Sequence, residues 1–212
     1  MRNIVKISTS ELPTEFGHYL IHIFKDLRTS IEHVALVMGN VSLEEDVLTR
    51  VHSECLTGDI FSSARCDCGE QLKLAQQLIT EEGCGIIIYL RDHEGRGIGL
   101  ANKIRAYALQ DKGLDTVEAN IALGLPVDKR SYLIASEILQ SLEVSSIRLM
   151  SNSPDKYNAL RKLGVLVNGL APLKIRPNKD NLRYLQTKQL KLGHLLISEA
   201  KTRLVQRSYK MR

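Results

Sequence analysis

The chain has 212 residues, of which 43% are hydrophobic and 25% charged, so it is long enough for one large or two small domains with a buried core. No apolar run approaches the ~20 residues of a membrane span, and the N-terminus lacks the apolar segment of a signal peptide. We therefore expect a cytoplasmic protein without a membrane partner. Most of the net charge of +5 lies in residues 199–212, so we expect a domain of residues 1–198 followed by a solvated basic tail, and no nucleic acid partner.

Strand patterns dominate the N-terminal part, and helices and strands alternate after it. Predicted strands cover residues 16–24, 31–38, 46–54, 85–90, 146–150 and 165–167. Predicted helices run from Cys68 to Gly83, through Ile104, Ala108 and Leu109 to Gly113, through Leu133, Ile138 and Leu142, from Ser153 to Gly164, and over residues 180–196. Residues 56–65 are expected to form a loop. The order of strand, glycine-rich loop and helix at residues 85–113 indicates an α/β unit.

Three of the four cysteines, Cys55, Cys66 and Cys68, follow a C-x10-C-x-C spacing. Such a cluster forms a metal site or part of a disulfide framework, or arises by coincidence. The absence of a secretory signal disfavours disulfides. Three thiolates suit zinc, and three protein ligands are typical of a catalytic site with an open fourth position. A structural site would need a fourth ligand, and Cys84 is separated from the cluster by a predicted helix, where we expect an inert buried thiol.

His52 and Glu54 share one face of the predicted strand that delivers Cys55, while Cys55 points to the other face. We therefore expect His52 beside a metal, contacting substrate, and not as a ligand. The H-x-E string that they form is also found in zinc nucleobase deaminases, but the P-C-x-x-C partner of those enzymes is absent.

Residues 94–99 place three glycines and Arg96 at a predicted helix start, which favours phosphate binding; the alternative is a tight turn that needs glycine for steric reasons. Asp128 and Arg130 lie just before a predicted helix. They either have a functional role or are simply a capping aspartate and a solvated arginine. Residues 152–156 read as a helix cap, or as a second helix start at which Lys156 contacts phosphate. Together these features favour hydrolysis of a phosphorylated, nucleotide-like substrate.

Seven motifs together resemble GTP cyclohydrolase II, from about Glu44 to Leu196. They are RVHSECLTGD, RCDCG, HEGRGIGL, KIRAYALQ, DTVEAN, LGLPVDKR and TKQLKLGHLL. The resemblance implies a single α/β domain with a mixed β-sheet flanked by helices, usually in a homodimer. The implied reaction converts GTP to 2,5-diamino-6-ribosylamino-4(3H)-pyrimidinone 5′-phosphate with release of formate and pyrophosphate, the first committed step of riboflavin synthesis. The chain resembles the stand-alone form, without the domain of bifunctional relatives that makes dihydroxybutanone phosphate.

The resemblance also implies roles for individual residues. One zinc per chain is expected on Cys55, Cys66 and Cys68, with Mg²⁺ on the triphosphate. The positions that match GTP contacts are Arg50, Val51, His52, Ser53, Glu54, Gln71, Glu94, Gly95, Arg96, Thr116, Ser151 and Lys156. Ser151 departs from the threonine expected there but keeps the hydroxyl.

Three further positions match catalytic roles: Asp128 as general base, Arg130 as nucleophile toward the α-phosphate, and Tyr107, which could also be core, as the residue that orients the attacking water. A guanidinium with a pKa above ~12 is a poor electron donor, so stabilisation of phosphate charge is the role we favour for Arg130. The rival class is a binding protein without turnover, either a zinc-and-nucleotide module or an RNA binder that uses its tail.

Overall fold

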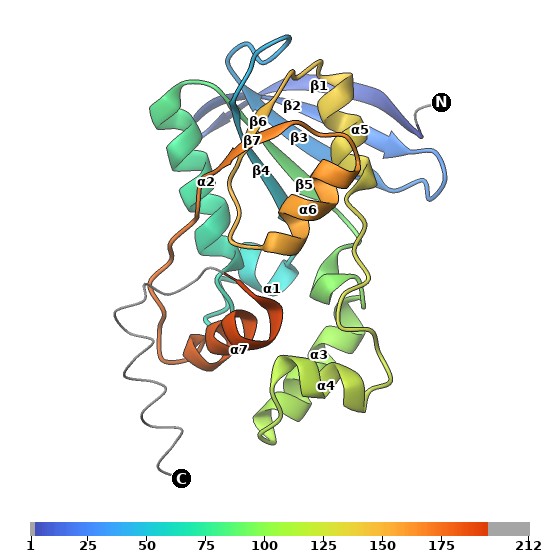
Figure 1. Ribbon diagram of the computed structural model, residues 1–212, viewed down its shortest axis with the longest axis vertical. Helices are drawn as coiled ribbons and strands as arrows, with labels where there is room; N and C mark the ends of the chain where they lie inside the picture. The colour runs from blue at the N-terminus through green and yellow to red at the C-terminus, as the bar shows by residue number, and fades with distance from the viewer. Residues whose placement is uncertain (1–2, 195–212) are drawn as a thin grey trace.

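Three N-terminal strands form an antiparallel meander in the computed structural model, which describes residues 3–194 (Figure 1). They are β1 (Ile4–Thr14), β2 (Gly17–Asp26) and β3 (Glu32–Met38). β3 pairs in turn with β5 (Gly85–Leu90), again antiparallel. Buried positions along β2 and β3 alternate with more exposed ones, the pattern of a sheet that is fully covered on one face.

The other half of the sheet is parallel. β4 (Val47–Ser53) lies between β5 and β6 (Ile147–Leu149), and β7 (Val167–Leu170) completes the order β1-β2-β3-β5-β4-β6-β7. After β4 the chain passes to β5 on one side and later to β6 on the other. In α/β sheets such a switch in direction leaves a crevice outside the carboxyl ends of the adjacent strands, which is where ligands bind.

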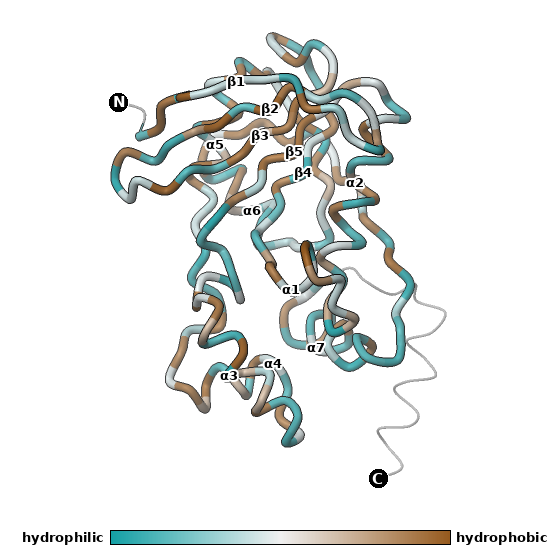
Figure 2. The backbone as a smooth tube through the Cα atoms, turned by 180° about the vertical axis from the view of Figure 1, so that it is seen from behind, coloured by the Kyte–Doolittle hydropathy of each residue, from teal (hydrophilic) through white to brown (hydrophobic). Residues whose placement is uncertain are grey.

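Helices cover both faces of the parallel strands. α2 (Cys68–Glu82) lies on one face, and α5 (Leu133–Ser141) and α6 (Pro154–Lys162) lie on the other (Figure 1). Ile86, Ile87 and Ile88 of β5 are all fully buried for this reason. Figure 2 shows hydrophobic residues concentrated along the central strands. Arg50 and His52 on β4 are buried in the same layer, and buried polar groups in a central strand point to function.

The remaining helices gather beyond the carboxyl ends of the parallel strands (Figure 1). They are α1 (Leu56–Asp59), the 3-10 helix η1 (Glu94–Arg96), α3 (Leu100–Asp111), α4 (Thr116–Ala122) and α7 (Leu182–Leu192). α4 begins with a capping box between Asp115 and Glu118, and α7 ends at Gly193 with a left-handed φ of 63°. No helix within residues 3–194 is both long and apolar enough to cross a lipid bilayer.

The predicted α/β class with one mixed sheet is confirmed, while several details of the prediction are wrong. Residues 56–65 contain the single turn α1, which Asp59 stabilises by accepting a hydrogen bond from the Cys55 amide at 3.0 Å. The last strand starts at Val167 and not at residue 165, and the last helix spans Leu182–Leu192. The predicted tail at residues 199–212 lies outside the described residues, so the domain limits remain a prediction.

Two of the three residues that mark the predicted helix before Gly113 lie on the exposed face of α3. The helix buries Lys103 and Ala106, while Ile104 is 48% exposed and Ala108 is exposed too. Lys103 is held in place by polar partners at the sheet edge, which compensate for the burial of its charge.

Candidate active site

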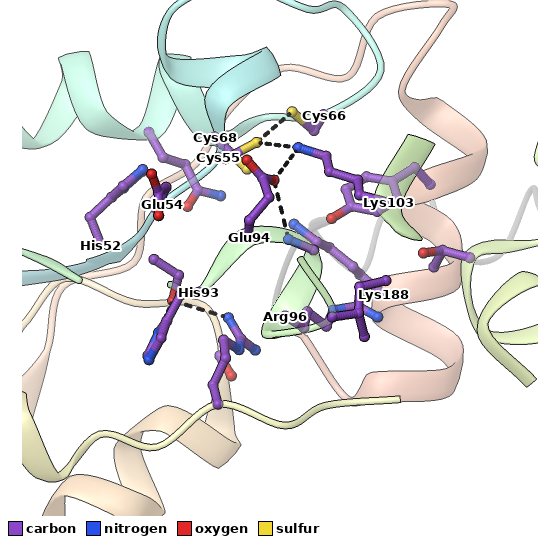
Figure 3. A pocket seen from close by; sticks show the side chains of 18 of the residues that line it. His52, Glu54, Cys55, Cys66, Cys68, His93, Glu94, Arg96, Lys103 and Lys188 are labelled. Atoms are coloured by element: carbon purple, nitrogen blue, oxygen red, sulfur yellow. Dashed lines mark hydrogen bonds and ion pairs between the residues drawn. The ribbon is translucent and has the colours of Figure 1, made fainter. Parts of the chain in front are cut away.

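The three clustered cysteines converge at the carboxyl end of β4. Cys55 follows β4, Cys68 is the first residue of α2, and Cys66 lies in the turn between them. Their Sγ atoms all lie within 4.8 Å of one another, and those of Cys55 and Cys66 are 3.8 Å apart. Figure 3 shows the three sulfurs gathered at one end of the pocket, next to Lys103 and Glu94.

The donor set fits a zinc ion. Tetrahedral zinc with Zn–S bonds of about 2.3 Å separates two ligand sulfurs by about 3.8 Å, which agrees with the separation of Cys55 and Cys66. The backbone leaves room for this convergence because residue 58 is glycine: a Cβ there would lie 2.8 Å from the Cys66 Sγ and 3.1 Å from the Cys55 Sγ. Hydrogen bonds from the other two thiols lower the pKa of Cys55, whereas the hydrogen bond to Cys55, together with burial, raises the pKa of Cys66 to about 11. Cys55 is therefore the thiol that loses its proton before Cys66 does.

Lys103 links this cluster to Glu94. Its ammonium donates to the Cys55 Sγ at 3.1 Å, the Thr57 hydroxyl at 2.8 Å and the Glu94 Oε1 at 2.5 Å. Burial opposes the charge, but Glu94 and the thiol raise the pKa of Lys103 above its usual value. The other oxygen of Glu94 accepts from the Leu56 amide at 2.7 Å, so this carboxylate bridges α1 and α3. Nothing in the helical pattern predicts that Lys103 is buried here.

His52 lies beside the thiols, as the sequence predicts, and Asp59 holds it there. Its Nε2 is 3.0 Å from an Asp59 carboxylate oxygen, and its ring stacks on Tyr89 with centroids 5.4 Å apart. Asp59 also accepts from the Tyr89 hydroxyl at 2.8 Å. Within the described part of the chain, the group of possible metal ligands at this place consists of the three cysteines and does not include His52.

The glycine-rich loop is a tight turn whose backbone is largely satisfied internally. The amides of Gly97 and Gly99 both donate to the Glu94 carbonyl, at 2.9 and 3.1 Å. Arg96 has a φ of 65°, a left-handed conformation that is uncommon outside glycine and that turns its side chain into the pocket. Its Nη2 is buried and has no hydrogen-bond partner among the described residues. An anion in the pocket would satisfy that donor, so the guanidinium is better suited to contact an anion than the loop amides are.

Asp128 and Arg130 form a forked ion pair. The Arg130 Nη2 lies 2.5 Å from one carboxylate oxygen of Asp128, and the Nε lies 3.0 Å from the other. Burial works against the charge of Arg130, but this pair raises its pKa further above the ordinary value, and the same pair lowers the pKa of Asp128. Arg130 also donates to the Ser53 hydroxyl at 3.3 Å, which lies 3.2 Å from the Nδ1 of His93. Burial and nearby cations lower the pKa of His93 to about 3, so its ring is neutral.

Lys156 enters the pocket from the first turn of α6. Ser153 caps this helix by accepting from the Lys156 amide, and Pro154 occupies the first turn, as predicted. The ammonium is buried and donates to the Val51 carbonyl at 2.5 Å. Burial, followed by repulsion from Arg50 and Arg130, lowers the pKa of Lys156 well below its usual value. An anionic ligand would reverse this shift, since it would stabilise the charged form.

The described residues that line the pocket include six lysine and arginine side chains but two carboxylates. Most predicted site residues are brought together there: Arg50, His52, Ser53, Glu54, Cys55, Cys66, Cys68, Gln71, Glu94, Gly95, Arg96, Tyr107, Thr116, Arg130, Ser151 and Lys156. Val51 and Asp128 are not among them. Val51 is buried in the core, where its carbonyl accepts a hydrogen bond from Lys156, and Asp128 contacts the pocket residue Arg130 through their ion pair. Sequence reasoning missed several lining residues, among them His93, Lys103, Tyr184, Lys188 and His194.

Fold and pocket together define an α/β protein in which a thiol cluster that could hold a metal ion adjoins a strongly cationic pocket. The chain belongs to the GTP cyclohydrolase II family, whose family model matches residues 5–172.

Curated relatives agree with this assignment. The chain is 52% identical over 194 residues to a GTP cyclohydrolase-2 of Shewanella sp., covering 92% of this chain and 95% of that protein. It is 50% identical over 196 residues to the monofunctional riboflavin biosynthesis protein RIBA 3, chloroplastic, of Arabidopsis thaliana, covering 92% of this chain but 38% of that protein. The riboflavin biosynthesis protein RibBA of Chlamydia trachomatis is 48% identical over 91% of this chain and 46% of its own length. The chain thus spans less than half the length of the latter two relatives.

Proposed function

We propose that this protein hydrolyses GTP at C8 of the purine, with release of formate and pyrophosphate, to give 2,5-diamino-6-ribosylamino-4(3H)-pyrimidinone 5′-phosphate. This would be the first committed step of riboflavin biosynthesis. The observation that carries the proposal is the placement of three convergent thiols at one end of a pocket rich in cations, in a chain of this family. A purine ring and a triphosphate need those two environments side by side.

The thiol end of the pocket is suited to opening the purine ring. Cys55, Cys66 and Cys68 would hold one zinc ion, which as a Lewis acid would activate a water for attack at C8. Lys103 would offset the negative charge of the thiolates and keep Cys55 in place. Burial raises the pKa of Tyr107 to about 12, so its phenol stays protonated and can donate a hydrogen bond that orients the water.

The cationic end of the pocket is suited to the triphosphate. Arg96 offers an unpaired buried Nη2, and Lys156 is a buried ammonium without a carboxylate partner among the described ion pairs. Arg130, fixed by Asp128, would stabilise negative charge at the α-phosphate as pyrophosphate leaves. Mg²⁺ would neutralise the β- and γ-phosphates. We assign Arg130 an electrostatic role because Asp128 strengthens its proton affinity.

Incubation with GTP tests this proposal against the binding-protein alternative. Formate, followed by proton NMR, and pyrophosphate, followed by a coupled enzymatic assay, should both appear and depend on added Mg²⁺. A matched Cys66→Ser variant should lose formate release together with its zinc, as measured by metal analysis. Tight retention of GTP with neither product would instead support a nucleotide-binding module.

We further expect a cytoplasmic homodimer. Leu100 and Ile104 on α3 are 40% and 48% exposed and lie one turn apart, which is compatible with a contact between two copies. Light scattering on the purified protein would test the dimer, and cell fractionation the location.

A further inference from the structure

Helix α7 forms a wall of the pocket although it lies beyond the segment that the family model matches. The model ends at residue 172, whereas Tyr184, Lys188 and His194 all line the pocket. Figure 3 shows Lys188 facing the same space as Arg96. The C-terminal part of the described chain is therefore part of the site and not an appendage to it.

The attachment of α7 to the metal-ligand turn is a buried ion pair. The Lys188 ammonium lies 2.8 Å from the Asp67 Oδ1, and the two side chains are 10% and 1% exposed. Asp67 sits between Cys66 and Cys68 in the chain, so it belongs to the turn that delivers two of the three thiols. An unpaired carboxylate at this place would be buried next to thiolates, and both effects disfavour the present geometry.

The ion pair is one end of a longer buried chain of contacts. The second oxygen of Asp67 accepts from the Gln71 Nε2 at 2.5 Å, and the Gln71 Oε1 accepts from the Arg50 Nη2 at 2.6 Å. Arg50 in turn donates to the Met150 carbonyl at 2.9 Å. These bonds connect α7, the ligand turn, the first turn of α2 and β4, so a loss at Lys188 can reach each of these elements.

The other polar contacts of α7 lie at the surface. Lys191 pairs with Asp115 and Glu118 of α4, and Arg183 donates to the Gly113 carbonyl. The Lys191 side chain is 42% exposed, so solvent screens its pairs and they contribute little to stability. Lys191 therefore provides a matched control: a lysine on the same helix, in an ion pair, but away from the thiols.

We propose that Lys188 is a positioning residue, which through Asp67 fixes the turn carrying Cys66 and Cys68 and fastens α7 as a wall of the pocket. The inference rests on the proposed function for its metal and substrate, but its geometric content does not depend on turnover. Removal of the ammonium should loosen the ligand turn and α7 together.

Hydrogen–deuterium exchange on Lys188→Met, with Lys191→Met as the control, tests the coupling. In Lys188→Met the amides of residues 64–72 and of α7 should exchange about tenfold faster or more, and zinc should transfer to a chromogenic chelator about 10- to 100-fold faster. Lys191→Met should match the wild type in residues 64–72 and in zinc transfer. Lys188→Arg keeps the charge and should recover part of the protection, which a merely space-filling role would not require.

The outcomes separate this inference from the proposed function. Unchanged exchange at residues 64–72 in Lys188→Met, in metal-loaded and chelated protein alike, would overturn the inference even if GTP is hydrolysed. If the turn loosens in Lys188→Met but the wild-type protein releases no formate from GTP, the inference about Lys188 stands and the proposed function is refuted. Should Lys188→Met fail to fold, Asp67→Asn provides the same measurement, because it removes the ion pair at nearly constant size.

Discussion

Substitution of Gly58 by alanine tests whether the thiols surround a metal ion. The new Cβ would lie 2.8 Å from the Cys66 Sγ, 3.1 Å from the Cys55 Sγ and 3.1 Å from the Cys68 Cβ. The first of these contacts is closer than real Cβ atoms come to other atoms. The methyl group would therefore push the thiols apart at the place where an ion needs them together.

The size of the effect follows from the cost of overpacking. An extra methyl in a packed site costs about 1–3 kcal/mol, which at about 1.4 kcal/mol per factor of ten corresponds to zinc binding about 5- to 140-fold weaker. The metal-free protein can relieve the contact by rotating its thiols, and alanine favours the helical conformation of α1. We therefore expect Gly58→Ala to weaken zinc binding much more than it destabilises the chelated protein.

Competition with a chelator of known zinc affinity, combined with denaturant unfolding of the chelated protein, measures both quantities. Gly169→Ala is the matched control, because the nearest atom to its new Cβ is the Arg148 Cγ at an ordinary 3.7 Å. If Gly58→Ala binds zinc as tightly as Gly169→Ala and the wild type, the space left by Gly58 does not set the arrangement of the thiols around the ion, and this reasoning is refuted.

Substitutions at four further residues probe the two ends of the pocket. Lys103→Met should weaken zinc binding and lower kcat by about 10- to 100-fold, with partial recovery in Lys103→Arg, because its ammonium contacts the Cys55 thiol; chelator competition and steady-state kinetics would show this, and wild-type values would contradict it. KM for GTP should rise with pH as the lowered pKa of Lys156 is passed, since the cation is lost there, and Lys156→Met should remove that pH dependence. Tyr107→Phe should slow formate release about 2- to 10-fold, more than pyrophosphate release, and equal slowing of both products would argue against its role in orienting water. Arg130→Lys should keep partial activity, with no nucleotidyl adduct on either protein by mass spectrometry after an acid quench; an adduct on wild-type Arg130 would refute the electrostatic role.

The features that sequence predicted well are those encoded locally. The spacing of the three cysteines, the apolar run of β5 and the cap at Ser153 each depend on neighbours in the chain, and the structure contains a thiol cluster, a buried strand and a capped helix there. β1 is not among the predicted strands, because its side chains are mostly polar and exposed and a bulge between Lys6 and Ser8 interrupts its register.

Two of the lining residues that sequence missed are buried lysines. Lys103 and Lys188 each lie on an amphipathic helix, where a lysine normally faces solvent. Their burial depends on carboxylates supplied by distant parts of the chain, Glu94 for the first and Asp67 for the second. The hydrophobic periodicity of a helix gives no sign of such a pairing.

The pairing of Asp128 with Arg130 favours one of the two proposed roles of that arginine on energetic grounds. A nucleophilic guanidine must first lose a proton, and with a pKa above ~12 this costs at least about 7 kcal/mol at pH 7. A neighbouring base could lessen that cost only by accepting the proton. The ion pair lowers the pKa of Asp128 and raises that of Arg130, so Arg130 holds its proton more firmly than an isolated arginine does, and Asp128 is a weaker base than an isolated aspartate. The same fork fixes the orientation of the charged group beside Ser53. A fixed cation needs no reorganisation when charge develops on a phosphate, which makes the geometry that hinders covalent catalysis the one that favours electrostatic stabilisation.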